Sequence, residues 1–154
     1  MHKKAYVKSI FLACTLAVHA LGAAPAHAEQ PRELAMLNSE HVNTMLNAVV
    51  PGQTKVLLDN LKSGELARPA AHMPMWILET IDSSILYYQG QEAFATLPAR
   101  RLVDDAGFRF GQAAIDKARR SKGTWLTLSL GGTRYEAYCA SKYPFVTCTL
   151  VTGK

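Results

Sequence analysis

The end of the chain, from Thr124 onward, constrains the fold more than any other part. Three runs rich in β-branched and aromatic residues predict strands over Thr124–Leu130, Thr133–Ala140 and Phe145–Val151. Gly131-Gly132 joins the first two, which is typical of a two-residue hairpin because both positions accept a positive φ. A four-residue turn, Ser141–Pro144, joins the second run to the third. We therefore expect an antiparallel three-strand meander.

The register of this meander can be tested against the alternation of side chains along a strand. If Leu130 faces Thr133 and Cys139 faces Cys148, one face is nearly all apolar and the other mostly polar, and a slip of one residue would mix them. The apolar face collects Leu126, Leu128, Leu130, Tyr135, Ala137, Cys139, Val146, Cys148 and Leu150. The other face collects Trp125, Thr127, Ser129, Arg134, Glu136, Tyr138, Thr147 and Thr149.

The start of the chain predicts export. Lys3, Lys4 and Lys8 precede an apolar run, Ile10–Leu21, and the small-residue triplet Ala26-His27-Ala28 follows. This order is typical of a secretory signal peptide over residues 1–28, cleaved after Ala28. The apolar run is shorter than the roughly 20 residues that a membrane-spanning helix needs. We expect a periplasmic or secreted protein with no membrane span in the mature chain.

Cleavage changes how the composition is interpreted. Of the 154 residues 126 remain, the size of one domain. Three of the 17 Lys and Arg residues leave with the signal, so 14 oppose 12 acidic residues and the net charge falls from +5 to +2. Such a modest charge, without a basic stripe carrying aromatic residues, argues against nucleic acid as a partner.

The two cysteines that remain after cleavage, Cys139 and Cys148, form an even pair in an oxidising compartment and predict a disulfide. In the expected register they lie directly opposite each other on adjacent strands. Their Cα atoms would then be roughly 4.5–5.5 Å apart, within the disulfide range. The mature histidines, His41 and His72, are far from both cysteines in the sequence, so no metal site is predicted.

Helices are predicted before the sheet. After a flexible leader at residues 29–32, apolar spacing predicts a helix over Glu33–Val50, with Ser39, Asn43 and Asn47 on the face opposite its apolar stripe. Pro51-Gly52 ends it. A second helix is expected over Gln53–Lys62, followed by a loose stretch, Glu65–Pro74.

The middle of the chain alternates between strand and helix signals. Met75–Tyr88 reads as two strands, although Met75–Ile81 fits a helix equally well, and Ala93–Leu97 is expected to pair back as a short strand. A polar loop over Pro98–Gly107 leads to a third helix, Phe108–Arg120. Residues 33–154 are thus expected to form a single α+β domain, with N-terminal helices packed on an antiparallel sheet that ends in the meander.

Motifs for catalysis are absent from the sequence. No nucleophile elbow, zinc-protease or phosphate-loop pattern occurs. The adjacent carboxyls of Asp104 and Asp105 would serve a hydrolase only if two carboxylates met in one cleft, whereas loop solvation and helix capping also explain them. The bases at the end of the third helix would receive an anion or simply complement the helix end; they are Lys117, Arg119, Arg120 and Lys122. We expect a protein that is not an enzyme and holds no cofactor.

The order of elements resembles a known family. Phe110–Tyr138, FGQAAIDKARRSKGTWLTLSLGGTRYEAY, resembles the single-cache, PAS-like extracytoplasmic sensor domains, in which a helix ends at a Gly-Gly-Trp-like corner before the strands return. Two features depart from that pattern: Gln89-Gly90-Gln91 replaces an acidic-glycine turn, and the Cys139–Cys148 pair is not characteristic. The resemblance implies a pocket for small organic acids, amines or other metabolites over an antiparallel sheet, here in a free-standing protein.

Two functions follow as hypotheses. The first is a small-molecule binding module, with Tyr87, Arg101 and Tyr135 as candidate ligand-binding residues. The second is a protein-binding inhibitor or immunity protein of the bacterial envelope. For that function, the aromatic and basic residues on the polar face of the meander, Trp125, Arg134 and Tyr138, are the candidate partner surface.

Overall fold

A computed structural model describes residues 30–153 of the chain. Three helices and five strands follow in the order α1 (Gln30–Ala48), α2 (Thr54–Ser63), β1 (Met75–Glu79), β2 (Ser84–Tyr88), α3 (Phe110–Ala118), β3 (Gly123–Leu130), β4 (Thr133–Lys142) and β5 (Phe145–Thr152). Two short 3-10 turns, η1 (Glu92–Phe94) and η2 (Ala99–Arg101), lie between β2 and α3. The predicted signal peptide lies outside the described residues.

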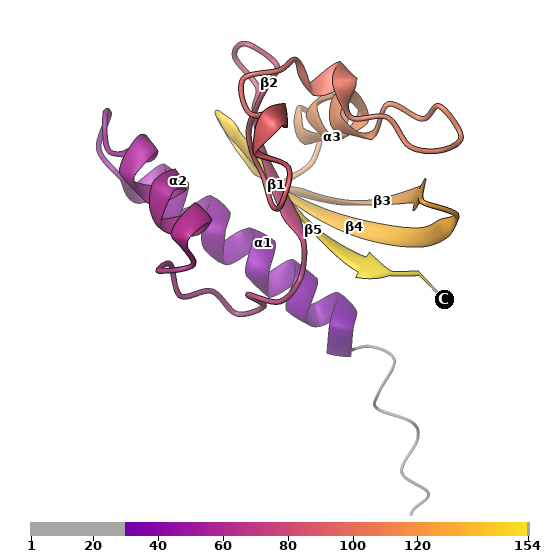
Figure 1. The fold of residues 1–154 in the computed structure, drawn as a ribbon. Helices are drawn as coiled ribbons and strands as arrows, with labels where there is room; N and C mark the ends of the chain where they lie inside the picture. The colour runs from indigo at the N-terminus through magenta and orange to yellow at the C-terminus, as the bar shows by residue number, and fades with distance from the viewer. Residues whose placement is uncertain (1–29, 154) are drawn as a thin grey trace, which may run out of the picture.

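The strands form one antiparallel sheet in the order β2-β1-β5-β4-β3. The long helix α1 and the shorter α2 lie on one face, and α3 lies on the other (Figure 1). The domain is therefore α+β with N-terminal helices on an antiparallel sheet, as the sequence predicted. Within residues 30–153, no helix combines the length and the apolar character needed to cross a bilayer.

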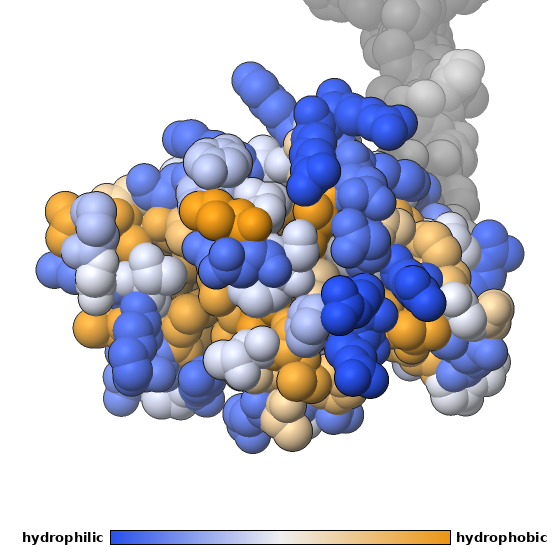
Figure 2. All heavy atoms as spheres, turned by 90° about the horizontal axis from the view of Figure 1, so that it is seen from above, coloured by the Kyte–Doolittle hydropathy of each residue, from blue (hydrophilic) through white to orange (hydrophobic). Residues whose placement is uncertain are grey.

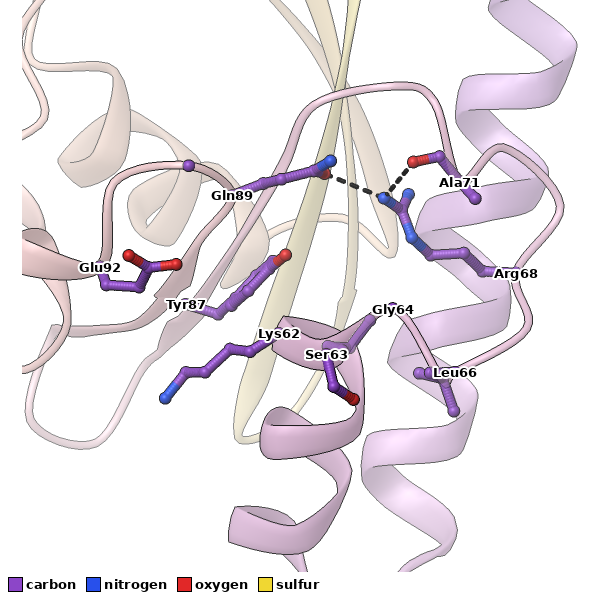
Figure 3. Close-up of a pocket in the computed structure, with 11 residues that line it drawn as sticks. Lys62, Ser63, Gly64, Leu66, Arg68, Ala71, Tyr87, Gln89 and Glu92 are labelled. Atoms are coloured by element: carbon purple, nitrogen blue, oxygen red, sulfur yellow. Dashed lines mark hydrogen bonds between the residues drawn. The ribbon is translucent and has the colours of Figure 1, made fainter.

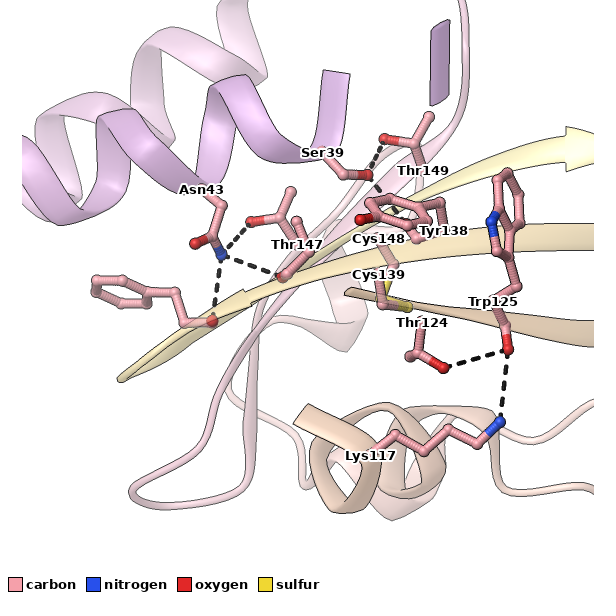
Figure 4. Close-up of a disulfide and its surroundings, with 12 residues drawn as sticks. Ser39, Asn43, Lys117, Thr124, Trp125, Tyr138, Cys139, Thr147, Cys148 and Thr149 are labelled. Atoms are coloured by element: carbon pink, nitrogen blue, oxygen red, sulfur yellow. Dashed lines mark hydrogen bonds between the residues drawn. A yellow bond between two sulfur atoms is a disulfide. The ribbon is translucent and has the colours of Figure 1, made fainter. Parts of the chain in front are cut away.

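The meander forms with the predicted register. Leu130 pairs with Thr133, Thr124 with Cys139, and Cys139 with Cys148. The two cysteines are joined in a disulfide with Cα atoms 4.0 Å apart. It lies beneath the sheet on the α3 side (Figure 4), fully buried among the apolar residues of that face.

The α3 face of the sheet is closed by apolar and aromatic side chains. Phe110, Ala114 and Ile115 of α3 pack on Leu126 and Leu128, and the core extends across the sheet to β1 and β2. Trp76 of β1 lies at its centre, stacked on Tyr88 with ring centroids 6.0 Å apart and edge-on to Phe110 at 5.3 Å. Gly111 permits the close approach of α3, because a Cβ there would collide with the backbone of Ala99.

The α1 face also holds apolar clusters, which include Val42 and Leu46 of α1, but it adds a set of buried polar side chains. We call Asn38, Ser39, Asn43, Thr147 and Thr149 the polar seam; all five are buried where α1 meets the sheet, and all but Asn38 are labelled in Figure 4. Asn38 Nδ2 donates to Thr149 Oγ1 at 2.9 Å, and Ser39 Oγ lies 2.8 Å from the same oxygen. Asn43 Nδ2 donates to Thr147 Oγ1 at 3.2 Å and to the Phe145 carbonyl at 3.1 Å.

The seam corrects the prediction for the first helix. The expected outer residues Ser39 and Asn43 are buried on the sheet, whereas the apolar side chain of Leu37 is 55% exposed. The physical reason lies in the meander, whose alternation points Thr147 and Thr149 at α1. Buried hydroxyls need hydrogen-bond partners, and the amides and hydroxyl of α1 supply them.

Three boundary predictions also change. Residues 30–32, expected in a flexible leader, form the first turn of α1, where Pro31 is compatible because early helix N–H groups lack intrahelical partners. Ala93–Leu97 is not a strand: Glu92–Phe94 forms η1, although Leu97 and Thr96 still exchange backbone hydrogen bonds with Ile85. Met75–Glu79, open to two interpretations, is strand β1, paired on both sides.

Candidate functional site

A pocket of about 220 Å³ opens beside the α1 face, between the end of α2, the segment that follows it, and the end of β2 (Figure 3). Gly64 ends α2 in the left-handed conformation at φ 76° and turns the chain back toward the sheet. The lining residues are Leu61, Lys62, Ser63, Gly64, Leu66, Arg68, Ala71, Tyr87, Gln89, Gly90 and Glu92. We call this cavity the Arg68 pocket.

Arg68 is a half-buried cation whose hydrogen-bond partners are all neutral. Its Nη1 donates to the Ala70 carbonyl at 2.8 Å, and its Nη2 donates to the Ala71 carbonyl at 2.7 Å and to Gln89 Oε1 at 2.9 Å. Asn38 Oδ1, in the polar seam, accepts from Arg68 Nη1 at 3.3 Å. The guanidinium thus connects the pocket to α1 and β2.

No acidic side chain among residues 30–153 forms a salt bridge with Arg68. Burial lowers the pKa of its guanidinium, because removal from water disfavours the charged form. An arginine still stays protonated under such a shift. A positive charge in this pocket is therefore solvated by carbonyl dipoles and is not neutralised.

Tyr87 lies beside Arg68 on the same face of the sheet. It pairs with Ile77 of β1 and is only 5% exposed, and in Figure 3 its hydroxyl points toward the Arg68–Gln89 side of the pocket. Burial raises the pKa of the phenol, so the group is a neutral hydrogen-bond donor at physiological pH. Its hydroxyl forms no hydrogen bond with another described residue.

The rim of the pocket carries one charge of each sign. Lys62, near the end of α2, and Glu92, in η1, flank Tyr87 (Figure 3). Lys62 Nζ lies 3.7 Å from Asp59 Oδ1 on the exposed side of α2. Two cations, Arg68 and Lys62, and one carboxylate, that of Glu92, line the pocket. Of these three charged residues, Arg68 is half-buried and the other two are exposed.

The structure separates the three predicted ligand-binding residues. Tyr87 lines the Arg68 pocket. Arg101 is exposed on η2, outside that pocket, and Tyr135 packs against the core on the α3 side of the sheet. Arg68 was not among the predicted site residues, because it stands in a loose stretch; the available signal was a lone arginine in a proline-bearing segment.

One polar atom is left unpaired in the α3 core. The indole Nε1 of Trp76, which is 1% exposed, has no hydrogen-bond partner. Aromatic rings occupy the surrounding space, with Tyr88 next to Phe94 at 5.6 Å between centroids. Apolar and aromatic side chains therefore pack around Trp76 on the α3 side. The face seen in Figure 2 carries hydrophilic and hydrophobic residues side by side.

The residues of the predicted partner surface are only partly accessible. Arg134 is exposed, but Tyr138 is 8% exposed beneath α1, where its hydroxyl donates to Glu40 Oε1 at 3.1 Å. Trp125 is half-buried between the Tyr138 ring and the guanidinium of Arg32. The guanidinium carbon of Arg32 lies 4.3 Å from the centroid of the Trp125 ring. The expectation that all three residues are exposed is wrong for Tyr138, because the first turns of α1 cover that corner of the sheet.

The paired carboxyls of Asp104 and Asp105 fasten a loop to the β3–β4 hairpin. Asp104 accepts from the backbone N–H groups of Ser129 at 3.0 Å and Phe108 at 2.8 Å, and Asp105 accepts from Gly132 at 2.8 Å. The backbone hydrogen bonds that Asp104 accepts, the one from Ser129 foremost, lower the pKa of its carboxyl. The pair has a structural role. Separately, within residues 30–153 no group of three or more His, Cys, Asp or Glu side chains is placed to hold a metal ion.

The comparisons with known proteins rest on structure alone. No protein-family model matches the chain, and no curated protein matches it in sequence. The fold is similar to the periplasmic sensor domain of a chemotaxis protein, with a TM-score of 0.61 and 11% identity over 85% of this chain and all of that one.

Two further solved structures share the fold. A methyl-accepting chemotaxis protein from Vibrio parahaemolyticus matches with a TM-score of 0.57 and 11% identity, over 79% of this chain and 84% of that one. A Cache chemosensory domain, described for its recognition of carboxylic acids, matches with a TM-score of 0.58 and 11% identity, over 83% and 99%. The cache-like fold predicted from the sequence is confirmed.

Proposed function

We propose that this chain is a non-enzymatic, extracytoplasmic domain that binds a small organic anion in the Arg68 pocket. The observation that carries the proposal is the half-buried guanidinium of Arg68, which has only neutral partners and lines a cavity beside an unpartnered phenol. A carboxylate entering this cavity would neutralise the buried charge and accept a hydrogen bond from Tyr87.

Electrostatics favour an anion over a neutral or cationic ligand. A charge-assisted hydrogen bond is roughly twice as strong as a neutral one, and a buried charge interacts more strongly than an exposed one. Four of the Arg68 N–H groups already have acceptors, so the ligand gains mainly from the charge, from Tyr87 Oη and from Lys62 at the rim. The cavity volume suits a small metabolite and not a polymer.

Two further observations support the setting. The similar solved structures include a periplasmic sensor domain and a Cache domain that recognises carboxylic acids. The disulfide between Cys139 and Cys148 fits an oxidising compartment, as does the signal-like start of the sequence. A protein partner in the envelope has weaker support, because Tyr138 of its candidate surface is buried.

The test is thermal unfolding of the purified protein with a panel of small mono- and dicarboxylates, each paired with its neutral amide. We expect carboxylates, but not amides, to raise the melting temperature, because a ligand that binds only the folded state stabilises it. Tyr87→Phe should weaken binding by about tenfold, the cost of one hydrogen bond to a charged group.

Tyr135→Phe is the matched control, since it removes a phenol from the other face of the sheet. It should leave carboxylate binding unchanged. The proposal fails if no carboxylate raises the melting temperature, or if Tyr87→Phe and Tyr135→Phe bind the active carboxylate equally well.

A further inference from the structure

A second concave site lies at the opposite end of the sheet, between the end of α3 and the β4–β5 turn. It has a volume of about 590 Å³ and is lined by Ala118, Arg119, Arg120, Ser121, Lys122, Ser141, Lys142 and Tyr143. An adjoining hollow continues along Arg119 and Tyr143 to Thr80 and Ile81. We call the two together the basic groove.

Hydrogen bonds hold the two walls of this groove together. The Ser141 N–H donates to the Lys122 carbonyl at 2.7 Å, and Ser141 Oγ donates to the Ala118 carbonyl at 3.1 Å. The end of α3 is therefore fixed against the end of β4. Cations from both elements face one space in a defined arrangement.

Among residues 30–153, the cations of the groove face no lining carboxylate and take part in no ion pair. Four cations line it, namely Arg119, Arg120, Lys122 and Lys142, and no acidic residue does. The ion pairs within residues 30–153 are Arg32–Glu136, Lys55–Asp59 and Lys62–Asp59, none of which involves the groove. The end of a helix carries only about half a negative charge, so four cations exceed what the end of α3 requires.

Exposed apolar side chains lie among these cations. Tyr143 is 76% exposed at the tip of the β4–β5 turn, and Ile81 is 59% exposed in the β1–β2 turn. Tyrosine and arginine together are typical of protein interfaces, where they supply most of the binding energy. A concave site also favours an inserted chain over a flat bilayer.

We propose that the basic groove binds an acidic peptide segment of a partner protein. The carboxylates of that segment would pair with Arg119, Arg120, Lys122 and Lys142, while an apolar side chain would pack against Tyr143 and Ile81. This site is separate from the Arg68 pocket, and the proposal does not depend on small-molecule binding there.

The test is the fluorescence anisotropy of a short labelled polyglutamate peptide with one central leucine, titrated with the purified protein at low salt. A polyglutamine peptide with the same leucine is the control. We expect only the acidic peptide to bind, with an affinity that falls as salt screens the charges. The double variant Arg119→Glu, Lys142→Glu should weaken binding by at least about tenfold, and Tyr143→Ala by a smaller factor.

Arg100→Glu supplies the matched charge reversal, because Arg100 is exposed on η2 outside the groove. It should change the affinity by less than about twofold. The proposal is overturned if the acidic peptide does not bind at low salt, or if Arg100→Glu weakens binding as much as the double variant. It is also overturned if vesicles of anionic phospholipid bind through Arg119 and Lys142 while the peptide does not.

Discussion

Both faces of the sheet bury apolar clusters, but they differ in the polar groups that they bury. On the α3 face, Trp76, Phe110 and the disulfide form an apolar core with a single unpaired polar atom, Trp76 Nε1. On the α1 face, α1 is joined to the strands by the polar seam, and the Arg68 pocket opens next to it. Apolar contacts are non-directional, whereas hydrogen bonds require their partners at set positions.

This difference concerns two properties of the domain, its stability and the position of α1. Both faces supply stability through buried apolar area, and the α3 face holds the larger cluster. The α1 face places α1 in one position, and Asn38 bonds both to the seam and to Arg68. Asn38 thus links the Arg68 pocket to the polar seam.

The largest effect is expected on the α3 face, from Phe110→Ala. This variant removes a fully buried ring from the centre of the core and should lower the free energy of unfolding by about 3–5 kcal/mol. Phe108→Ala, which truncates a ring that is 39% exposed two residues earlier, should cost less than about 1 kcal/mol. Urea unfolding measures both, and equal losses would contradict the role of the buried Phe110 ring in the core.

The disulfide should rank next. The Cys139→Ala, Cys148→Ala double variant opens a loop closed across a sequence separation of 9. It is expected to lose about 2.5 kcal/mol, mainly because the unfolded chain regains freedom. Dithiothreitol should destabilise the native protein and leave the double variant unaffected in the same urea experiment. An equal response to the reductant in both proteins would show that the bond is not formed in solution.

The polar seam should give a smaller loss. Thr149→Val keeps the shape of the side chain but removes the oxygen that meets both Asn38 and Ser39. Leaving a buried polar group unpaired costs about 1–3 kcal/mol. The free energy of unfolding should therefore decrease by an amount in that range. Thr127→Val, at an exposed position on β3, should change stability by less than about 0.5 kcal/mol. If Thr149→Val were equally neutral, α1 would not depend on these bonds.

The smallest effect should be pH-dependent and come from Asp104. Its pKa is lowered in the folded protein, so its stabilising bonds are present above the ordinary pKa of about 3.9 and are lost as the pH falls through the lower, folded value. Asp104→Asn should therefore reduce the melting temperature at neutral pH, and the gap to the native protein should narrow in acid. A gap that stays constant with pH would contradict this role for the carboxylate.

Much of the fold was predictable because turn chemistry and alternation agree at the end of the chain. Gly131-Gly132 and the facing cysteines specify a register that every pair of the meander follows. The polar side of α1 was misplaced for a physical reason: helical spacing shows that Ser39 and Asn43 share a face but not whether water or Thr147 covers it. Only the sheet itself, brought together from distant segments, decides that.

The site was less predictable than the fold. Tyr87, a candidate from the sequence, is among the residues that line the Arg68 pocket, and its role in ligand binding stays a prediction. Its neighbour Arg68 comes from a segment without periodicity, and its environment arises from Gln89, Asn38 and the carbonyls of its own turn. Arg101 lies on η2 and Tyr135 on the α3 side of the sheet, both outside the Arg68 pocket. The predicted order of elements does not specify on which face of the sheet a side chain lies.

The most direct test of this account is a two-dimensional ¹H–¹⁵N NMR titration with the carboxylate that gives the largest thermal shift, or with acetate, lactate and succinate if none is preferred. The Arg68 Nε–H reports on the pocket, and the Trp76 indole N–H reports on the α3 core. We predict that the Arg68 signal moves in a saturable manner while the Trp76 signal stays in place. Movement of the Trp76 signal with an unchanged Arg68 signal would place the ligand on the opposite face of the sheet and contradict the account.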